Sequence, residues 1–124
     1  VPTNAYTAAY MNMKESGGAN DNTVVLQTLT ETYSGAPVTI FAALVLSGSW
    51  SSILQPFIYL QEDGVNIIGI PIYNTNYLSI SFPPVRRVPS AGSHIYRIVV
   101  IYSGVTSSSA TLGHRSIVSL ETKR

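Results

Sequence analysis

The chain has 124 residues and a mass of 13.4 kDa, contains no cysteine and carries a net charge of +1 at pH 7. This length suits one domain with a core of ordinary size, and the lack of cysteine excludes a disulfide framework and a thiolate metal site. The small net charge gives no electrostatic case for binding nucleic acid, and the longest apolar run, Val38–Leu46, is far shorter than the roughly 20 residues of a membrane span.

The N-terminal part of the chain predicts an arm followed by a strand. Asn4–Met13 suits either a strand or a short helix, and we interpret residues 1–14 as an extended N-terminal arm. Residues 15–124 are expected to form a single domain. A loop rich in glycine, asparagine and aspartate covers Glu15–Asn22. Thr23–Thr30 is rich in β-branched residues, which predicts a strand.

The middle of the chain predicts four more strands. Val38–Ser47 is continuously apolar, which indicates burial on both faces, either in a sandwich core or against another subunit. Phe57–Gln61 and Val65–Ile70 flank a turn of the Asp-Gly type at residues 62–64, a pattern typical of a β-hairpin. Tyr77–Phe82 alternates apolar residues with serine, which predicts a strand with one buried face.

The C-terminal part predicts the most hydrophobic strands. Turn formers at Pro89–Gly92 precede an apolar strand over Ile95–Tyr102, and a polar loop leads to a last strand at Arg115–Leu120. We expect these two strands to form a hairpin. Prolines mark the predicted strand boundaries, at Pro37, Pro56, Pro71, Pro83, Pro84 and Pro89. About eight strands without an amphipathic helix predict an all-β fold, an antiparallel jelly-roll sandwich.

This C-terminal part also carries a family resemblance. From Pro89 the order is proline, a small residue, Ala-Gly, Ser-His-x-Tyr, an apolar strand, a polar loop and Arg-Ser-Ile-x-x-Leu-Glu-x-Lys-Arg. That order resembles the closing strands of TNF/C1q-like jelly rolls found in phage virion and tail proteins. The middle of the chain matches the family only in the rhythm of its strands. The resemblance implies a homotrimer in which the chain finishes on a strand near the trimer axis.

The composition independently favours contact with partners. Only 10% of the residues are charged, against about a quarter in a typical soluble domain. With so few charges and a mean hydropathy of +0.22, a monomer would be poorly solvated. The chain has eight tyrosines, and tyrosine suits subunit interfaces because it buries a large area while keeping a polar tip. These features predict self-association.

No residue pattern predicts a catalytic, cofactor-binding or metal-binding site. His94 and His114 precede the two C-terminal strands and are expected at opposite ends of that pair, either as solvated side chains or as ion ligands on a trimer axis. Glu62 and Asp63 are adjacent in a turn and point apart, whereas catalytic carboxylate pairs usually come from different strands. No Gly-x-Ser-x-Gly motif occurs. We therefore interpret the chain as non-enzymatic.

Five residues are candidates for contact with a partner. Trp50 lies in a predicted loop of serine and glycine. An exposed tryptophan there would serve as an interface anchor or as a platform on which a sugar stacks, and the alternative is a core residue folded under its own loop. Arg86 and Arg87 lie in a loop flanked by prolines and either contact an acidic partner surface or simply solubilise the loop. Tyr96 and Tyr102 belong to one face of their strand and are candidates for a subunit interface.

Our main hypothesis is a bacteriophage virion structural protein. It would be a homotrimer on the virion surface that decorates and stabilises the capsid, with its own copies and the major capsid protein as partners. One alternative is the receptor-binding head of a tail fibre, which would recognise a host glycan through Trp50 and the tyrosines but would need an attachment domain. Another is a secreted TNF/C1q-like ligand, which no signal-peptide feature favours. None of these hypotheses involves a cofactor, a nucleic acid or a membrane.

Overall fold

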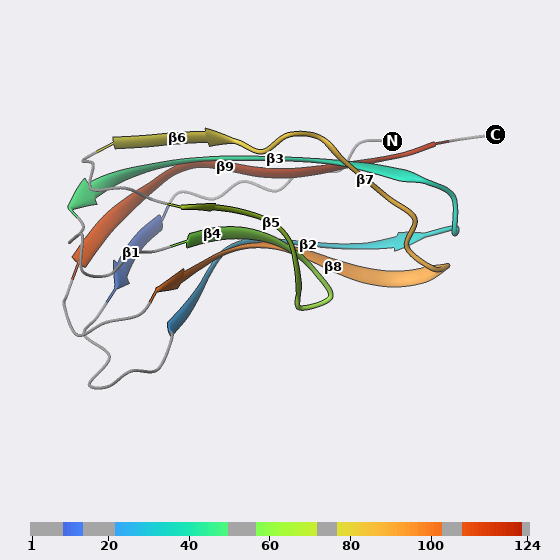
Figure 1. The fold of residues 1–124 in the computed structure, drawn as a ribbon, viewed down its shortest axis with the longest axis horizontal. Coiled ribbons are helices and arrows are strands. Elements are labelled where there is room, and N and C mark those ends of the chain that lie inside the picture. The colour runs from blue at the N-terminus through green and yellow to red at the C-terminus, as the bar shows by residue number, and fades with distance from the viewer. Residues whose placement is uncertain (1–8, 14–21, 50–56, 72–76, 103–107, 123–124) are drawn as a thin grey trace.

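The structure is a computed structural model that describes residues 9–13, 22–49, 57–71, 77–102 and 108–122. Within these ranges it contains nine strands, and no helix that could cross a membrane occurs there. The strands are β1 (Ala9–Met13), β2 (Asn22–Tyr33), β3 (Val38–Ser49), β4 (Phe57–Glu62), β5 (Val65–Pro71), β6 (Tyr77–Ser81), β7 (Val85–Arg87), β8 (Gly92–Tyr102) and β9 (Ser108–Glu121). They form two antiparallel sheets packed face to face (Figure 1), which confirms the predicted all-β sandwich.

Both sheets are built largely from strands that are not neighbours in the sequence. The first sheet has the order β1-β9-β3-β6, with the short strand β7 also paired to β3, and the second has the order β2-β8-β4-β5. The hairpin expected between the two C-terminal strands is therefore wrong, since β8 and β9 lie in different sheets. Ile98 on β8 and Ile117 on β9 instead approach the same core from opposite sides. Alternation reveals which side chains are buried, but it does not reveal the sheet to which a strand belongs.

The core lies between the inner faces of the two sheets. It contains Leu26, Leu29, Tyr33, Val38, Ile40, Ala42, Leu44, Ile58, Leu60, Ile80, Phe82, Tyr96, Ile98, Val100 and Ile117. The strand β3 was expected to be buried on both faces, but the structure buries only one. Its inner residue Ile40 is fully buried, whereas Phe41 on the outer face is 41% exposed.

The hairpin expected around the Asp-Gly turn is confirmed. Strands β4 and β5 pair antiparallel, from Phe57 opposite Pro71 to Glu62 opposite Val65. Asp63 and Gly64 connect them with φ values of 49° and 84°. Two positive φ values are the signature of the type I′ connection, whose twist matches that of the flanking strands, and aspartate and glycine are residues that tolerate them.

The segment around Arg86 and Arg87 differs from the expected loop. It forms the short strand β7, in which Thr39 pairs with Arg86 and Val38 pairs with Arg87. Three residues are too few to show an alternating pattern, which explains why the sequence did not predict this strand. The pairing places the two arginines on opposite faces of the first sheet, because successive side chains of a strand point to opposite sides.

Candidate functional site

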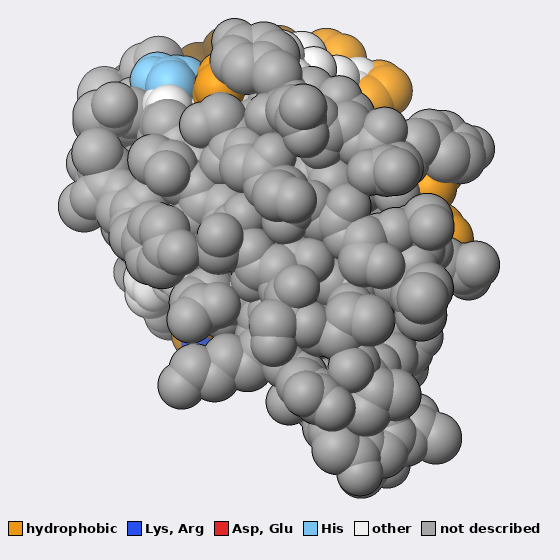
Figure 2. Space-filling model, turned by 90° about the vertical axis from the view of Figure 1, so that its left-hand side faces the viewer, with side chains coloured by type: hydrophobic (Ala, Val, Ile, Leu, Met, Phe, Trp, Pro, Cys, Tyr) orange, Lys and Arg blue, Asp and Glu red, His pale blue; other side chains and the backbone are white. Residues whose placement is uncertain are grey.

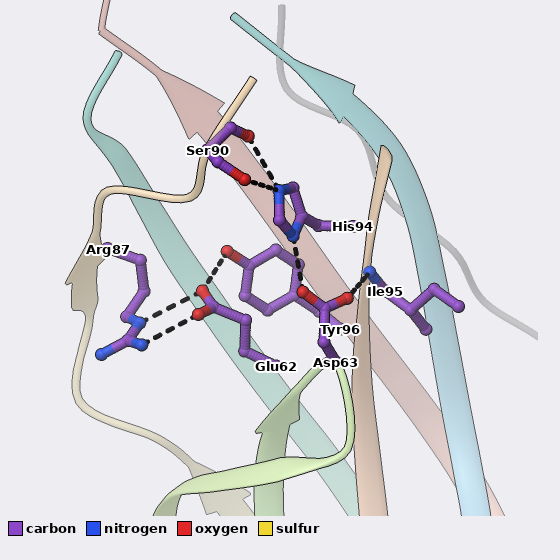
Figure 3. A network of polar contacts seen from close by, with 7 residues as sticks. All are labelled: Glu62, Asp63, Arg87, Ser90, His94, Ile95 and Tyr96. Carbon is purple, nitrogen blue, oxygen red and sulfur yellow. Dashed lines mark hydrogen bonds and ion pairs between the residues drawn. The ribbon is translucent and has the colours of Figure 1, made fainter. Parts of the chain in front are cut away.

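A polar cluster lies where the β4–β5 turn meets the segment from β7 to β8 (Figure 3). Its members are Glu62, Asp63, Arg87, Ser90, His94 and Tyr96. The sheet register brings them together. The pairing of β4 with β8 ends at Glu62 opposite Tyr96, and the pairing of β7 with β3 turns Arg87 inward. The polar cluster thus joins two stretches that are distant in the sequence, residues 62–63 and residues 87–96.

Glu62 is the centre of the first half of the cluster. The guanidinium of Arg87 donates two hydrogen bonds to its carboxylate, from Nε to Oε2 at 3.1 Å and from Nη2 to Oε1 at 2.8 Å. The hydroxyl of Tyr96 donates a third bond to Oε2 at 2.6 Å. Mainly because of the Arg87 bonds, the pKa of Glu62 is lowered despite partial burial. Burial, followed by the bond to Glu62, raises the pKa of Tyr96. Glu62 therefore remains a carboxylate that ties β7 of the first sheet to β4 and β8 of the second.

Asp63 and His94 form the second half of the cluster. Oδ1 of Asp63 accepts a hydrogen bond from the amide of Ile95 at 2.9 Å, and Oδ2 lies 2.5 Å from Nδ1 of His94. The other ring nitrogen of His94, Nε2, lies 2.8 Å from the backbone oxygen of Ser90 and 3.3 Å from its Oγ. The contact with Asp63 raises the pKa of His94, and the same contact, followed by the Ile95 amide, lowers the pKa of Asp63.

Ser90, His94 and Asp63 contact one another in the order of a serine hydrolase triad. The protons on the two ring nitrogens of His94, however, are arranged differently. In such a triad Nε2 must be unprotonated so that it can accept the serine proton. Here Nε2 lies closer to the Ser90 carbonyl oxygen, which can only accept a hydrogen bond, than to Ser90 Oγ, so the geometry favours a proton on Nε2. Nδ1 faces the carboxylate of Asp63, which favours a proton there as well. An imidazolium has no lone pair with which to act as a base, so the arrangement suits an ion pair rather than acyl transfer.

Of the five contact residues predicted from the sequence, the structure describes the side chains of three, Arg86, Arg87 and Tyr96. Arg87 and Tyr96 meet at the carboxylate of Glu62, and Tyr96 has no exposed surface within the chain. Arg86 is exposed on the opposite side of the first sheet. Trp50 lies outside the described residues, and Tyr102 ends β8 with a side chain that is also outside the description. Tyr96 is thus placed as an internal hydrogen-bond donor rather than as a surface residue.

Sequence reasoning missed the polar cluster as a unit. Glu62 and Asp63 were expected to point apart, and they do bind different partners, Arg87 and His94. Those partners lie 25 and 31 residues further along the chain, and no local pattern links such positions. The only local signal was the Asp-Gly turn, which predicted the hairpin but not its contacts.

The outer surface of the first sheet is apolar and nearly uncharged. We define the outer β3–β9 face by its described side chains Thr39, Phe41, Ala43, Val45, Arg86, Ser116, Val118 and Leu120. Phe41 pairs with Val118, and Leu120 is 44% exposed. Arg86 carries the one permanent charge of this set, opposite Thr39 at the β7 edge. The described side chains of this face thus include two large apolar residues, Phe41 and Leu120, that stay exposed within a single chain.

The outer surface of the second sheet is covered in part by its own aromatic side chains. Phe57 and Tyr59 stack with ring centroids 6.0 Å apart. The ring of Tyr59 lies over Gly69, where a Cβ atom would come within 2.4 Å of Cε1 of the tyrosine. In the end-on view of Figure 2, hydrophobic side chains are visible along the upper and right-hand rim of the molecule. Exposed apolar side chains therefore occur on more than one side of the sandwich.

Comparison with known proteins gives a likeness in fold. No family model matches the sequence, and no curated protein matches it. The chain resembles the structure of the Gx strain of infectious bursal disease virus over 100% of its length, with a TM-score of 0.62 and 14% identity. For the Gt strain, 97% of the chain is covered with a TM-score of 0.60 and 15% identity. The VP2 subviral particle of the same virus matches 97% of the chain, with a TM-score of 0.57 and 14% identity.

These comparisons bear on fold rather than on activity. The present chain spans about a third of the length of those viral chains, covering 33% of each. Because the identities are low, the likeness establishes architecture alone. The jelly-roll class predicted from the strand pattern is confirmed by it, whereas membership of the TNF/C1q-like family stays a prediction.

Proposed function

We propose that this chain is a non-enzymatic structural protein of a virus particle. The observation that carries the proposal is the likeness in fold to two structures of infectious bursal disease virus. The Gx strain matches 100% of the chain, and the VP2 subviral particle matches 97% of it. The described polar residues support a non-enzymatic role, because the contacts of His94 with Asp63 and with the backbone oxygen of Ser90 favour the imidazolium, which cannot act as a base. A protein of this kind acts through its surfaces.

The proposal includes self-association through the outer β3–β9 face, which would bind a second and a third copy of this chain. Phe41 and Leu120 are 41% and 44% exposed there, and a single permanent charge, on Arg86, lies at the edge of this face. Burying these side chains would be favourable, at about 25 cal/mol per Å² of apolar area. A standard interface covers about 800 Å² per partner, which is a modest share of the 6548 Å² of accessible surface. Copies of this face can meet without burying an unpaired charge if Arg86, at its edge, stays in contact with water.

Within this proposal, the working form is a homotrimer that decorates and stabilises a capsid or another virion surface, as in the phage proteins that the C-terminal part resembles. Residues 1–14 would then be an arm next to the domain of residues 15–124. Ala9–Met13 of that arm lies along β9 as β1, at an edge of the first sheet. An edge strand is well placed to contact a neighbouring subunit.

The receptor-binding alternative depends on Trp50 and on a glycan, and the described residues offer no specific contact in its favour. The secreted-ligand alternative depends on the TNF/C1q-like resemblance alone. Glycan-array binding would support the first of these. The virion proposal has the broader support, because both the fold likeness and the apolar outer face bear on it.

Two measurements test the proposal in sequence. Light scattering should give a mass near three times the 13.4 kDa of one chain, and the species should persist on dilution. Co-sedimentation with purified phage capsids that lack the protein should then show saturable binding at a fixed stoichiometry. A monomer, or a trimer that binds glycans and ignores capsids, would overturn the decoration role.

A further inference from the structure

We propose that His94 and Asp63 form a pH-dependent latch, which holds the β4–β5 turn against the start of β8 in acidic and neutral solution and releases it in alkaline solution. This inference does not depend on the virion role, because it rests only on contacts within one chain. It concerns the mobility of the turn formed by Asp63 and Gly64, and it assigns a role to the only histidine in the polar cluster.

Three contacts hold the turn in place. The amide of Asp63 donates a hydrogen bond to the backbone oxygen of Ile95 at 2.8 Å, and the amide of Ile95 donates to Oδ1 of Asp63 at 2.9 Å. The third contact joins Oδ2 of Asp63 to Nδ1 of His94 at 2.5 Å. The turn lies at the solvent, and the Asp63 side chain is 45% exposed. It therefore depends on these few contacts rather than on burial of apolar surface.

The closed arrangement is best satisfied by the doubly protonated imidazole. Nδ1 faces the carboxylate of Asp63 and Nε2 faces the backbone oxygen of Ser90, and both oxygens accept hydrogen bonds. Each neutral tautomer of His94 would place one nitrogen lone pair against one of these oxygens. The loss of one proton thus weakens the closed arrangement, because one of these two oxygens loses its donor and only the hydroxyl of Ser90, 3.3 Å from Nε2, can still donate to the ring. Protonation and closure of the turn are coupled by this geometry.

The groups around His94 favour the protonated form. The titratable and charged groups that face it are Glu62 and Asp63 from the turn, Glu31 and Tyr33 from β2, Arg87 from β7 and Tyr96 from β8. Glu31 is the residue paired with His94 across the β2–β8 ladder, and the ring of Tyr33 lies 6.2 Å from the imidazole. The one cation among these groups, Arg87, is engaged by Glu62. These groups together therefore carry a net negative charge.

The direction of the pH dependence follows from the two pKa shifts. The pKa of His94 is raised above its ordinary 6.5, mainly by Asp63, and the pKa of Asp63 is lowered below its ordinary 3.8, mainly by His94. The contribution of His94 to closure is complete below pH 6.5 and is lost as the pH rises through its raised pKa. The contribution of Asp63 is lost only as the pH falls through its lowered pKa. The latch is closed between these limits.

Opening is expected to remain local. Glu62, the last residue of β4, is held independently by Arg87 and Tyr96, whose bonds do not involve His94. The core residues Leu60 and Ile98 lie further inside and are fully buried. The turn can thus detach while the hairpin and the sandwich stay folded.

Amide hydrogen exchange measured by NMR from pH 5 to pH 9 on the whole chain tests the latch. After correction for intrinsic exchange, the protection of the Asp63 and Ile95 amides should fall about tenfold for each pH unit between 6.5 and the pKa of His94 in the folded chain. The core amide of Ile98 should show no such loss. The Asp63→Asn variant should move the loss to lower pH, and His94→Gln should make the protection independent of pH.

The variant His114→Gln is the matched control, since it removes the other histidine of the chain and should leave the Asp63 profile unchanged. A flat profile in the unmodified protein, or a loss that Asp63→Asn does not shift, would overturn the latch. Should a variant fail to fold, the Hε1 resonance of His94 in the unmodified protein decides the matter. A midpoint at or below 6.5 contradicts the proposal, and a higher midpoint supports it.

Discussion

The hydroxyl of Tyr96 lies 2.6 Å from Oε2 of Glu62, although the tyrosine side chain has no exposed surface. The ring of Tyr33 packs edge-on against that of Tyr96 at 5.9 Å. A buried phenol must find a partner for its hydroxyl, and here that partner is a carboxylate whose charge is balanced by Arg87. This part of the sandwich is thus held by a hydrogen-bonded ion pair and not by apolar packing alone.

The first prediction concerns this hydrogen bond. Tyr96→Phe removes the donor and leaves the ring in place, so we expect a loss of about 1.5 to 3 kcal/mol in the free energy of unfolding, as for a hydrogen bond to a charged group. Urea denaturation followed by circular dichroism measures it. The matched control is Tyr59→Phe on the outer surface, where the ring stays over Gly69 and we expect little change. Equal losses in both variants would contradict the assignment.

The second prediction separates the two adjacent arginines. Arg87→Ala leaves the partly buried carboxylate of Glu62 without its cation, whereas Arg86→Ala removes an exposed side chain for which no comparable pair is described. Because the Arg87 side chain is 40% exposed, solvent screening limits its ion pair, and we expect a loss of about 1 kcal/mol. For Arg86→Ala we expect a change within about 0.5 kcal/mol. The reverse order of stability would show that the pairing with Glu62 is unimportant.

The local parts of this fold could be predicted from the sequence, and the long-range parts could not. The β4–β5 hairpin depends on Asp63 and Gly64, which are adjacent and have a known backbone preference. The pairing of β8 depends on which strands compete for its edges, and an apolar pattern fits several partners equally well. The hairpin expected between β8 and β9 failed for this reason.

The polar cluster was beyond sequence reasoning for a related physical reason. Its contacts require the register of β7 on β3 and of β4 on β8 to be known to a single residue, since a shift of one residue reverses the faces. With that register, Arg87 points to Glu62 and Arg86 points away. Without it, the two arginines are equivalent neighbours in a proline-flanked segment.

The third prediction tests the contact between Tyr59 and Gly69. In Gly69→Ala the new Cβ atom would lie 2.4 Å from Cε1 of Tyr59, so the ring must move and its stacking on Phe57 is disturbed. We expect a loss of about 1 to 3 kcal/mol, as for other overpacked sites. In a chain that already carries Tyr59→Ala, the Gly69→Ala substitution should cost little stability, because the ring that the new Cβ atom would meet is then absent. A double-mutant cycle measures this coupling, and additive losses would contradict it.

The fourth prediction concerns Ser90. Because the 2.8 Å contact between Nε2 of His94 and the Ser90 backbone oxygen favours a proton on Nε2, we expect His94 not to act as a base toward the serine hydroxyl. We expect a fluorophosphonate probe to leave the protein unlabelled at pH 7 under conditions that label a serine hydrolase added to the same sample. Mass spectrometry of the intact chain measures the result. Labelling that disappears in Ser90→Ala would show that the triad-like connectivity is active.

The last prediction asks which outer surface joins the copies. Phe41→Glu places a charge in the centre of the outer β3–β9 face, next to Val118, whereas Phe57→Glu places one beside Tyr59 on the second sheet. Both phenylalanines are 41% exposed, so the cost within a single chain should be similar. Burying an unpaired carboxylate between subunits is costly, so we expect Phe41→Glu to sediment at the 13.4 kDa of one chain. Phe57→Glu should keep the mass of the unmodified protein. If Phe57→Glu dissociates the assembly and Phe41→Glu does not, the contact lies on the second sheet.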